Sequence, residues 1–149
     1  MQWLTPAGAF NNPSIKKKKS IVLINSSWCN SCKVMERTTF IDPLVYPYAD
    51  STYRFVYFDA EITDTITYKG QNYTNPRLPT MPFHQLALAL TRNNLILPTV
   101  ALLDEDNNLI DAIPFYVPPA LMKKILYFFG EDIHKSKSWI DYEKSLTGQ

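Results

Sequence analysis

Both cysteines of this 149-residue chain, Cys29 and Cys32, lie in the segment Trp28-Cys29-Asn30-Ser31-Cys32-Lys33. The segment directly follows Ile21 to Ile24, a short apolar run typical of a buried strand. Two thiols at this spacing can close and reopen a small disulfide ring. If a helix begins at the first cysteine, its backbone amides and positive dipole end favour a thiolate there. The pair is therefore predicted to carry thiol–disulfide chemistry, because the chain has no other cysteine for a structural bridge.

Disulfide exchange needs one thiolate that attacks and a second thiol that resolves the mixed disulfide. Cys29, expected at a helix start with an exposed sulfur, is the predicted attacker, and Cys32, one turn further on and less accessible, is the predicted resolving thiol. A helix start can lower the pKa of a cysteine from ~8.5 towards ~7. Asn30 and Ser31 add no charge between the two cysteines, which favours a reducing pair over a strongly oxidising one.

Other uses of the cysteine pair stay open. A zinc site needs about four ligands, and the only histidines, His84 and His134, lie at no zinc-finger spacing, so no metal site is predicted. His84 is interpreted as a capping or packing residue. A non-catalytic alternative is a module that binds a protein partner or hands on a metal ion such as copper. Within redox chemistry, the alternative is a disulfide isomerase or oxidant.

Composition indicates one ordinary globular domain. The hydrophobic fraction is 46% and the formal net charge is +1, so neither disorder nor binding to nucleic acid is indicated. No stretch approaches the roughly 18 apolar residues of a membrane span. Lys16 to Lys19 are expected to form a solvated turn, because the apolar run after them is too short for a signal peptide. The start without a leader fits a cytoplasmic protein or an exported one whose leader has been removed.

The hydrophobic pattern predicts a single α/β domain over residues 1–149. Residues 3–15 are expected to form a loose helix or an irregular lead-in. The expected strands are 20–26, 53–60, 99–103 and 109–113, and the expected helices are about 29–40, 44–50, 83–91, 118–129 and 138–146. An insert, about 62–82, contains a small hairpin, and about 131–149 form a C-terminal extension. This order matches the thioredoxin fold, a central mixed β-sheet flanked by helices, with the insert between the second strand and the middle helix.

Leu97-Pro98-Thr99 stands immediately before the expected strand 99–103. A proline at a strand entrance removes one ladder donor, and it is tolerated where neighbouring backbone stays free to pair with something else. The tripeptide alone is a weak signal. The tripeptide becomes a strong signal here because it follows the C-x-x-C pair by two structural elements.

With these motifs the chain resembles the thioredoxin-like superfamily. More narrowly, it is similar to exported bacterial thioredoxin-family proteins related to the periplasmic domain of the transmembrane thiol:disulfide interchange reductant. The resemblance covers roughly residues 3–130 and is loose in the insert. It is carried by Trp28 to Lys33, Met35-Glu36, Thr39-Phe40, Asp42-Pro43, Phe58-Asp59-Ala60-Glu61, Leu97-Pro98-Thr99 and Leu102-Leu103-Asp104 leading into Asn107-Asn108.

The resemblance implies a role for each residue of the motifs. Cys29 would be the nucleophile, Cys32 the resolving thiol and Trp28 a lid beside them. Pro98 would be a cis proline against the disulfide, with the Leu97 backbone pairing to the substrate strand and Thr99 beginning the next strand. The apolar Leu97 before this proline resembles the reductants of the family more than the oxidants. The implied partners are a disulfide-bearing protein substrate and an upstream thiol electron donor, with no cofactor beyond the redox-active disulfide, in a periplasmic or otherwise exported monomer.

The chain departs from thioredoxin at the buried aspartate six positions ahead of the first cysteine, where it has Leu23. By sequence order, Asp59 and Glu61 are the possible proton acceptors for Cys32; the alternative is a strand-end turn and a solvated carboxylate. Lys33 either supports the thiolate electrostatically or is merely exposed. Tyr68 and Tyr73 of the insert either shape a partner-binding rim or belong to a self-packed hairpin.

Overall fold

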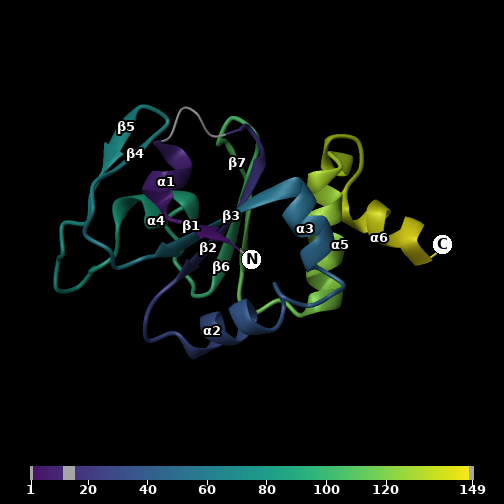
Figure 1. Cartoon of the computed structure of the whole chain (residues 1–149), viewed down its shortest axis with the longest axis horizontal. Helices are drawn as coiled ribbons and strands as arrows, with labels where there is room; N and C mark the ends of the chain where they lie inside the picture. The colour runs from purple at the N-terminus through teal and green to yellow at the C-terminus, as the bar shows by residue number, and fades with distance from the viewer. Residues whose placement is uncertain (1, 12–15, 148–149) are drawn as a thin grey trace.

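The computed structural model describes residues 2–11 and 16–147. Its centre is a five-stranded mixed sheet of order β1-β3-β2-β6-β7 (Figure 1). β1 and β2 both run parallel to β3, whereas β6 is antiparallel to β2 and to β7. The strands are β1 (Trp3–Leu4), β2 (Lys19–Asn25), β3 (Tyr53–Asp59), β6 (Thr99–Leu103) and β7 (Leu109–Pro114).

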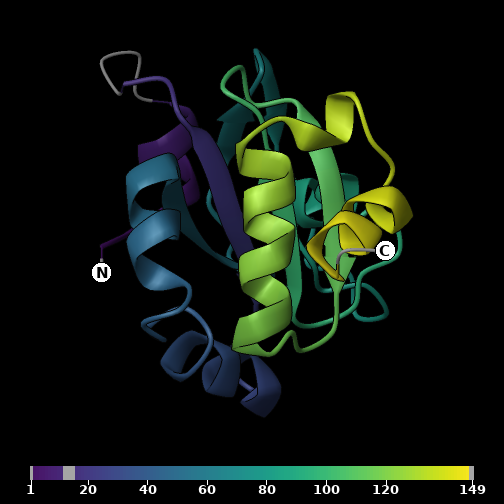
Figure 2. The same ribbon diagram turned by 90° about the vertical axis from the view of Figure 1, so that its right-hand side faces the viewer.

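Helices cover both faces of this sheet and one of its ends (Figures 1 and 2). One face carries α1 (Pro6–Phe10), α4 (Gln85–Leu90) and a two-stranded hairpin, β4 (Ile66–Tyr68) with β5 (Gln71–Tyr73). The other face carries α3 (Tyr46–Thr52) and α5 (Pro119–Gly130), and α2 (Asn30–Arg37) lies at the end of the sheet. A short 3-10 turn (Ile133–Lys135) and α6 (Trp139–Thr147) follow α5.

The core consists of two apolar layers, one on each face of the sheet. Consecutive residues of β2 point alternately into the two layers, so Leu23 lies in one and Ile24 in the other, and both are fully buried. This two-sided burial explains why β2 has an uninterrupted apolar run instead of an alternating pattern. The expected α/β thioredoxin fold with a mixed, helix-flanked sheet is confirmed.

Two expectations about the N-terminal region are only partly right. Pro6–Phe10 form the short helix α1, within the loose helix or irregular lead-in expected over residues 3–15. Trp3 and Leu4 form a short strand that pairs with Phe55 and Val56, where a loose helix or irregular segment was expected. Trp3 packs edge-on against Phe40 and Phe55, which accounts for the pairing of so short a strand. The expectation for residues 12–15 lies outside the described residues.

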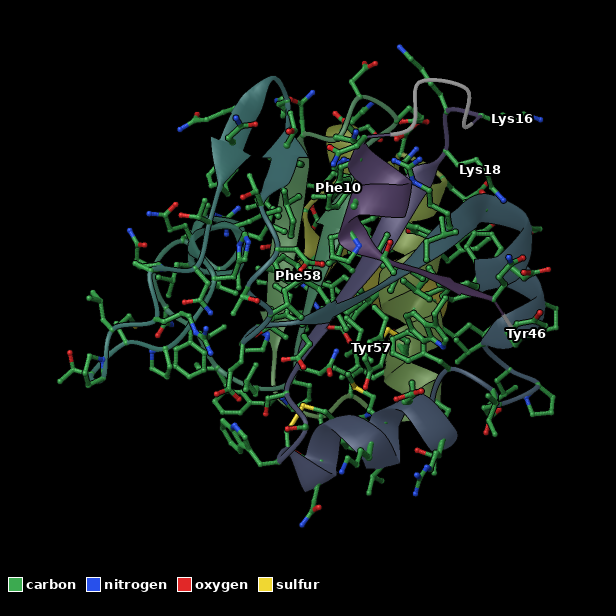
Figure 3. The ribbon with its side chains drawn as sticks, turned by 60° about the vertical axis from the view of Figure 1, so that its left-hand side comes forward. Phe10, Lys16, Lys18, Tyr46, Tyr57 and Phe58 are labelled. Carbon is green, nitrogen blue, oxygen red and sulfur yellow. A yellow bond between two sulfur atoms is a disulfide. The ribbon has the colours of Figure 1, made fainter. Side chains whose placement is uncertain are left out.

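Lys19 is the second exception. Lys16 points away from the body of the molecule (Figure 3), as expected for a solvated turn, whereas Lys18 is half-buried and its ammonium donates to the Asp50 carbonyl at 3.2 Å. Lys19 instead begins β2 with only 6% of its side chain exposed, and its ammonium lies 3.0 Å from Glu105 and 3.2 Å from Asp132. Burial acts to lower the pKa of Lys19, but these two carboxylates outweigh it and raise the pKa. A paired lysine can therefore occupy a core strand where an unpaired one could not.

His84 caps and packs, as the sequence indicates. Its Nδ1 accepts the Leu86 N–H at 3.1 Å at the start of α4, and Nε2 lies 2.8 Å from the carbonyl oxygen of Asp64. The ring also contacts Phe58 edge-on. Burial lowers the pKa of His84 below 6.5, against the opposing effect of Asp64. The folded protein therefore favours the neutral imidazole, the form in which Nδ1 can accept a hydrogen bond.

A pH-dependent loss of stability follows from His84. The stabilisation is complete above the unfolded-state pKa of about 6.5 and is lost as the pH falls from there through the lower, folded-state pKa. The free energy of unfolding, measured by urea titration, should thus decline between pH 7.5 and 5.5. His84→Asn keeps a capping oxygen but cannot titrate, so this variant should be less stable at pH 7.5 and show a shallower decline. An equally steep decline in the variant would contradict this role of His84.

Candidate active site

Three strands have an end at the same end of the sheet, next to α2. The parallel strands β2 and β3 end side by side, with Asn25 opposite Asp59. The antiparallel strand β6 begins there, with Thr99 opposite Ile24. Asn25 holds the ends of β2 and β3 together, because its side-chain amide donates to the carbonyl oxygens of Leu23 and Phe58 at 3.0 and 3.1 Å. The register therefore brings together residues from the C-x-x-C, Phe58–Glu61 and Leu97–Thr99 motifs.

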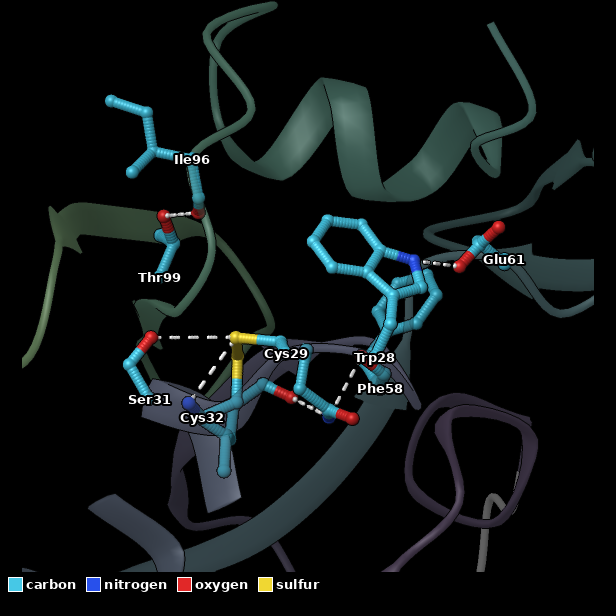
Figure 4. Close-up of a disulfide and its surroundings, with 10 residues drawn as sticks. Trp28, Cys29, Ser31, Cys32, Phe58, Glu61, Ile96 and Thr99 are labelled. Carbon is cyan, nitrogen blue, oxygen red and sulfur yellow. Dashed lines mark hydrogen bonds between the residues drawn. A yellow bond between two sulfur atoms is a disulfide. The ribbon is translucent and has the colours of Figure 1, made fainter. Parts of the chain in front are cut away.

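Cys29 and Cys32 form a disulfide at the start of α2, with 5.4 Å between their Cα atoms (Figure 4). Cys29 is the N-cap residue, and its sulfur accepts the Cys32 N–H at 3.2 Å. The Ser31 hydroxyl lies 3.5 Å from the same sulfur. Cys29 is therefore the cysteine whose sulfur is held by the helix start.

The expectation of an exposed Cys29 sulfur is too strong. Cys29 is 5% exposed and Cys32 is 2% exposed, so the order of accessibility agrees with the prediction but both residues are buried. Figure 4 shows Ile96 and Thr99 on one side of the disulfide and Trp28 on the other.

The proline segment is built as a tight turn before β6. The peptide bond between Leu97 and Pro98 is cis. The Thr99 hydroxyl donates to the Ile96 carbonyl at 2.5 Å, and the Pro98 carbonyl accepts the Phe115 N–H at 2.8 Å. Pro98 and Thr99 are buried, and Leu97 is half-buried. Two hydrogen bonds thus hold the segment on which the predicted substrate contacts depend.

Trp28 and Glu61 lie on the other side of the cysteine pair. The Trp28 side chain is 61% exposed, and its indole N–H donates to the Glu61 carboxylate at 2.6 Å (Figure 4). Asp59 accepts the Glu61 backbone N–H at 2.9 Å and so shapes the turn that carries Glu61. Lys33 is half-buried, and its backbone N–H donates to the Cys29 carbonyl at 3.3 Å. Of the carboxylates of Asp59 and Glu61, that of Glu61 is hydrogen-bonded to the cysteine motif, through Trp28.

Asn75 closes the base of the insert, and sequence reasoning missed it. Its buried amide donates to the carbonyl oxygens of Pro82, Ile62 and Glu61 at 2.9, 3.1 and 3.3 Å. The β4–β5 hairpin packs into the core through Ile66 and Tyr68, as a self-packed hairpin does. Asparagine at a loop start is too common to single out, so no sequence signal identified this residue.

Within residues 2–11 and 16–147, no group of three or more His, Cys, Asp or Glu side chains could hold a metal ion. A separate finding, over the same residues, is that no helix is long and apolar enough to cross a membrane.

Comparison with known proteins establishes the family. The family model for a thioredoxin-like domain matches residues 9–130, so the chain belongs to this family. Because the chain carries the C-x-x-C pair as a disulfide at the helix start, it is a thiol–disulfide oxidoreductase of the thioredoxin-like class. No curated protein sequence matches the chain.

Two solved structures with TM-scores above 0.5 have the same fold as this chain. A thioredoxin-fold protein from Helicobacter pylori is 17% identical with a TM-score of 0.66, over 93% of this chain and 88% of that chain. The DsbH oxidoreductase is 16% identical with a TM-score of 0.55, over 85% and 82% of the two chains. The oxidised C-terminal domain of DsbD from Neisseria meningitidis is 18% identical with a TM-score of 0.44, over 82% and 83%. At the identities of the first two structures, the similarity establishes the fold alone.

Proposed function

We propose that the chain works in the reducing direction and transfers two electrons from its cysteine pair to disulfides of protein substrates. The observation that carries this proposal is the Cys29 sulfur at the N-cap of α2, 3.2 Å from the Cys32 amide. In the reduced protein this amide and the helix dipole stabilise a Cys29 thiolate. Asn30 and Ser31 place no cation between the cysteines, and this favours a reductant over a strong oxidant.

The proposed reaction has two exchange steps. The Cys29 thiolate attacks one sulfur of the substrate disulfide, which forms a mixed disulfide and releases the other substrate sulfur as a thiolate that takes up a proton. Cys32 then loses its proton and attacks the Cys29 sulfur, which releases the second substrate thiolate. The substrate has gained two electrons, and the protein holds the Cys29–Cys32 disulfide. An upstream dithiol donor reduces this disulfide, so no further cofactor is needed.

The proline segment is the proposed docking site for the substrate chain. Leu97 would pair its backbone with an extended substrate segment, with Pro98 against the disulfide and Thr99 holding the turn through Ile96. Backbone pairing of this kind binds an extended chain whatever its sequence. The proposal accounts for a broad class of protein disulfides as substrates.

The midpoint potential of the Cys29–Cys32 pair tests the direction of electron flow. Reductants such as thioredoxin lie at about −270 mV and strong oxidants at about −120 mV. Equilibration in glutathione or dithiothreitol buffers, followed by alkylation and mass spectrometry, should give a value below about −230 mV. A value near −120 mV would assign the oxidant role instead, and a value of about −180 mV the isomerase role.

Glu61 and Asp59 are the two proposed proton acceptors for Cys32, and Glu61 is proposed to have a second role. Glu61 holds the Trp28 lid through its hydrogen bond to the indole, and either carboxylate is available as the proton acceptor for Cys32. If the lid is the main role of Glu61, Glu61→Gln keeps the acceptor and retains kcat/KM for insulin within about twofold, whereas Glu61→Leu lowers it about three- to tenfold. A loss in Glu61→Gln that matches that of Glu61→Leu would assign proton transfer to Glu61. The matched variant Asp59→Asn applies the same test to the second carboxylate.

An exported compartment and a monomeric state complete the proposal. The support for export is the resemblance to exported reductants at the cysteine and proline motifs. Labelling of intact cells with a membrane-impermeant maleimide after reduction should modify Cys29; protection until lysis would place the protein in the cytoplasm. Sedimentation equilibrium should give the mass of one chain, 17.2 kDa.

A further inference from the structure

Phe115 combines a strained backbone with an exposed aromatic ring. Its φ angle is +72°, in the left-handed region, and its side chain is 62% exposed. Bulky residues rarely adopt this conformation because their Cβ atom crowds the neighbouring carbonyl. The other non-glycine residues with positive φ among those described are all polar: Lys69, Arg77, Arg92, Asn93, Asn107 and Asp132.

Phe115 lies where the proline segment meets α2. It directly follows β7, whose last residue Pro114 pairs with Thr99, and its N–H donates to the Pro98 carbonyl at 2.8 Å. The next two residues contact α2 and its C-terminal end. The Tyr116 hydroxyl lies 3.4 Å from Thr38, and the Val117 N–H lies 3.4 Å from the Met35 sulfur. Phe115 therefore belongs to the strip that connects the two elements beside the disulfide.

Packing does not account for a phenylalanine at this position. The ring leaves most of its surface in water, so burial contributes little to folding, and the backbone conformation suits glycine or asparagine better. Strain of this kind persists where the surroundings impose it, and it concentrates at functional sites. A rigid aromatic ring beside a reaction centre offers a partner a large apolar contact at a low cost in conformational entropy.

We propose that Phe115 is a specificity-determining residue for disulfide exchange. Its ring contacts an aromatic or large aliphatic side chain that flanks the reacting cysteine of an extended polypeptide. Tyr116, which follows Phe115, is 41% exposed and lies 3.4 Å from Thr38 at the end of α2, and Val34 of α2 is 49% exposed. This inference rests on the proposed exchange reaction and adds a preference among substrates. Large apolar side chains are exposed more often in unfolded or misfolded chains than in folded proteins, so such chains are the preferred substrates.

The test uses two synthetic peptide disulfides that differ only in the residue beside the cysteine, phenylalanine in one and serine in the other. The wild-type protein should reduce the phenylalanine peptide with a kcat/KM about tenfold higher. Phe115→Gly removes the ring and suits the positive φ, so it should bring the two peptides within about twofold. The rate with 2-hydroxyethyl disulfide, a small aliphatic disulfide without flanking side chains, is measured for each variant and normalises the two peptide rates for any change in the cysteine pair itself.

Three further measurements separate specificity from folding. Phe115→Gly should melt at the wild-type temperature or up to about 4 °C above it, and Phe115→Asn, which also tolerates the left-handed region, should lose the preference in the same way. Lys69→Gly makes the same backbone change at φ +53° in the β4–β5 turn and should keep the preference. An unchanged peptide ratio in Phe115→Gly, or an equal loss with both peptides and 2-hydroxyethyl disulfide, would overturn the inference. If the wild type reduces neither the peptides nor 2-hydroxyethyl disulfide, the exchange reaction itself is the wrong account.

Discussion

Serine in place of Cys32 is expected to turn the protein into a trap for its substrates. The reduced Cys32→Ser variant keeps the attacking thiol at the start of α2 but has no second thiol to resolve the mixed disulfide. Incubation with insulin should therefore yield a covalent complex through Cys29, visible on a non-reducing gel and released by dithiothreitol. Turnover should fall by at least about a thousandfold, because each molecule stops after one attack.

Cys29→Ser is the matched control for this trap. It removes the predicted nucleophile, keeps the buried Cys32, and changes one sulfur to oxygen, as the first variant does. No covalent complex should form, and turnover should fall at least as far. A complex of equal yield in Cys29→Ser would exchange the roles of the two cysteines, and no complex in either variant would contradict exchange through this pair.

Alanine in place of Phe58 is expected to cause the largest loss of stability. Phe58 lies on β3, is fully buried, and packs against His84 on the face that carries α4. Removing its ring loses burial and leaves a cavity, which costs about 3–5 kcal/mol. Since domains of this size are stable by about 5–15 kcal/mol, the variant should lose about a fifth or more of its stability.

Urea titration at pH 7.5 measures this loss. Phe58→Leu, which keeps most of the apolar volume, should cost about 1–2 kcal/mol. The Phe58 carbonyl also accepts the Asn25 amide at the edge of the active site, but that bond involves only the backbone. The folded fraction of Phe58→Ala should thus retain insulin reduction. A loss below about 1 kcal/mol would mean that the two layers of the core repack around the gap.

Features with local signals could be predicted from the sequence. The apolar run of β2, the C-x-x-C pair after it and the Leu97-Pro98-Thr99 tripeptide each lie within a few residues, and the order of elements defined the fold. α2 ends at Arg37 instead of near Phe40: the backbone leaves helical geometry at Thr38, and the turn after it buries Thr39 and Phe40. Such terminal contacts leave no clear periodic signal.

Features that depend on distant partners could not be predicted. Lys19 is buried because Glu105 and Asp132 reach it, and Trp28 meets Glu61 only because β2 and β3 end together. The positive φ of Phe115 is invisible in sequence, since aromatic residues ordinarily avoid it. In each case the contact joins residues that are far apart along the chain, and no local pattern records it.

The relative alkylation rate of the two thiols tests the central claim most directly. The fully reduced protein is treated at pH 7 with limiting iodoacetamide, and peptide mass spectrometry measures the label at each cysteine. A thiolate held at the N-cap of α2 predicts that Cys29 reacts at least about tenfold faster than Cys32. Equal rates, or faster labelling of Cys32, would contradict the assignment of Cys29 as the attacking sulfur.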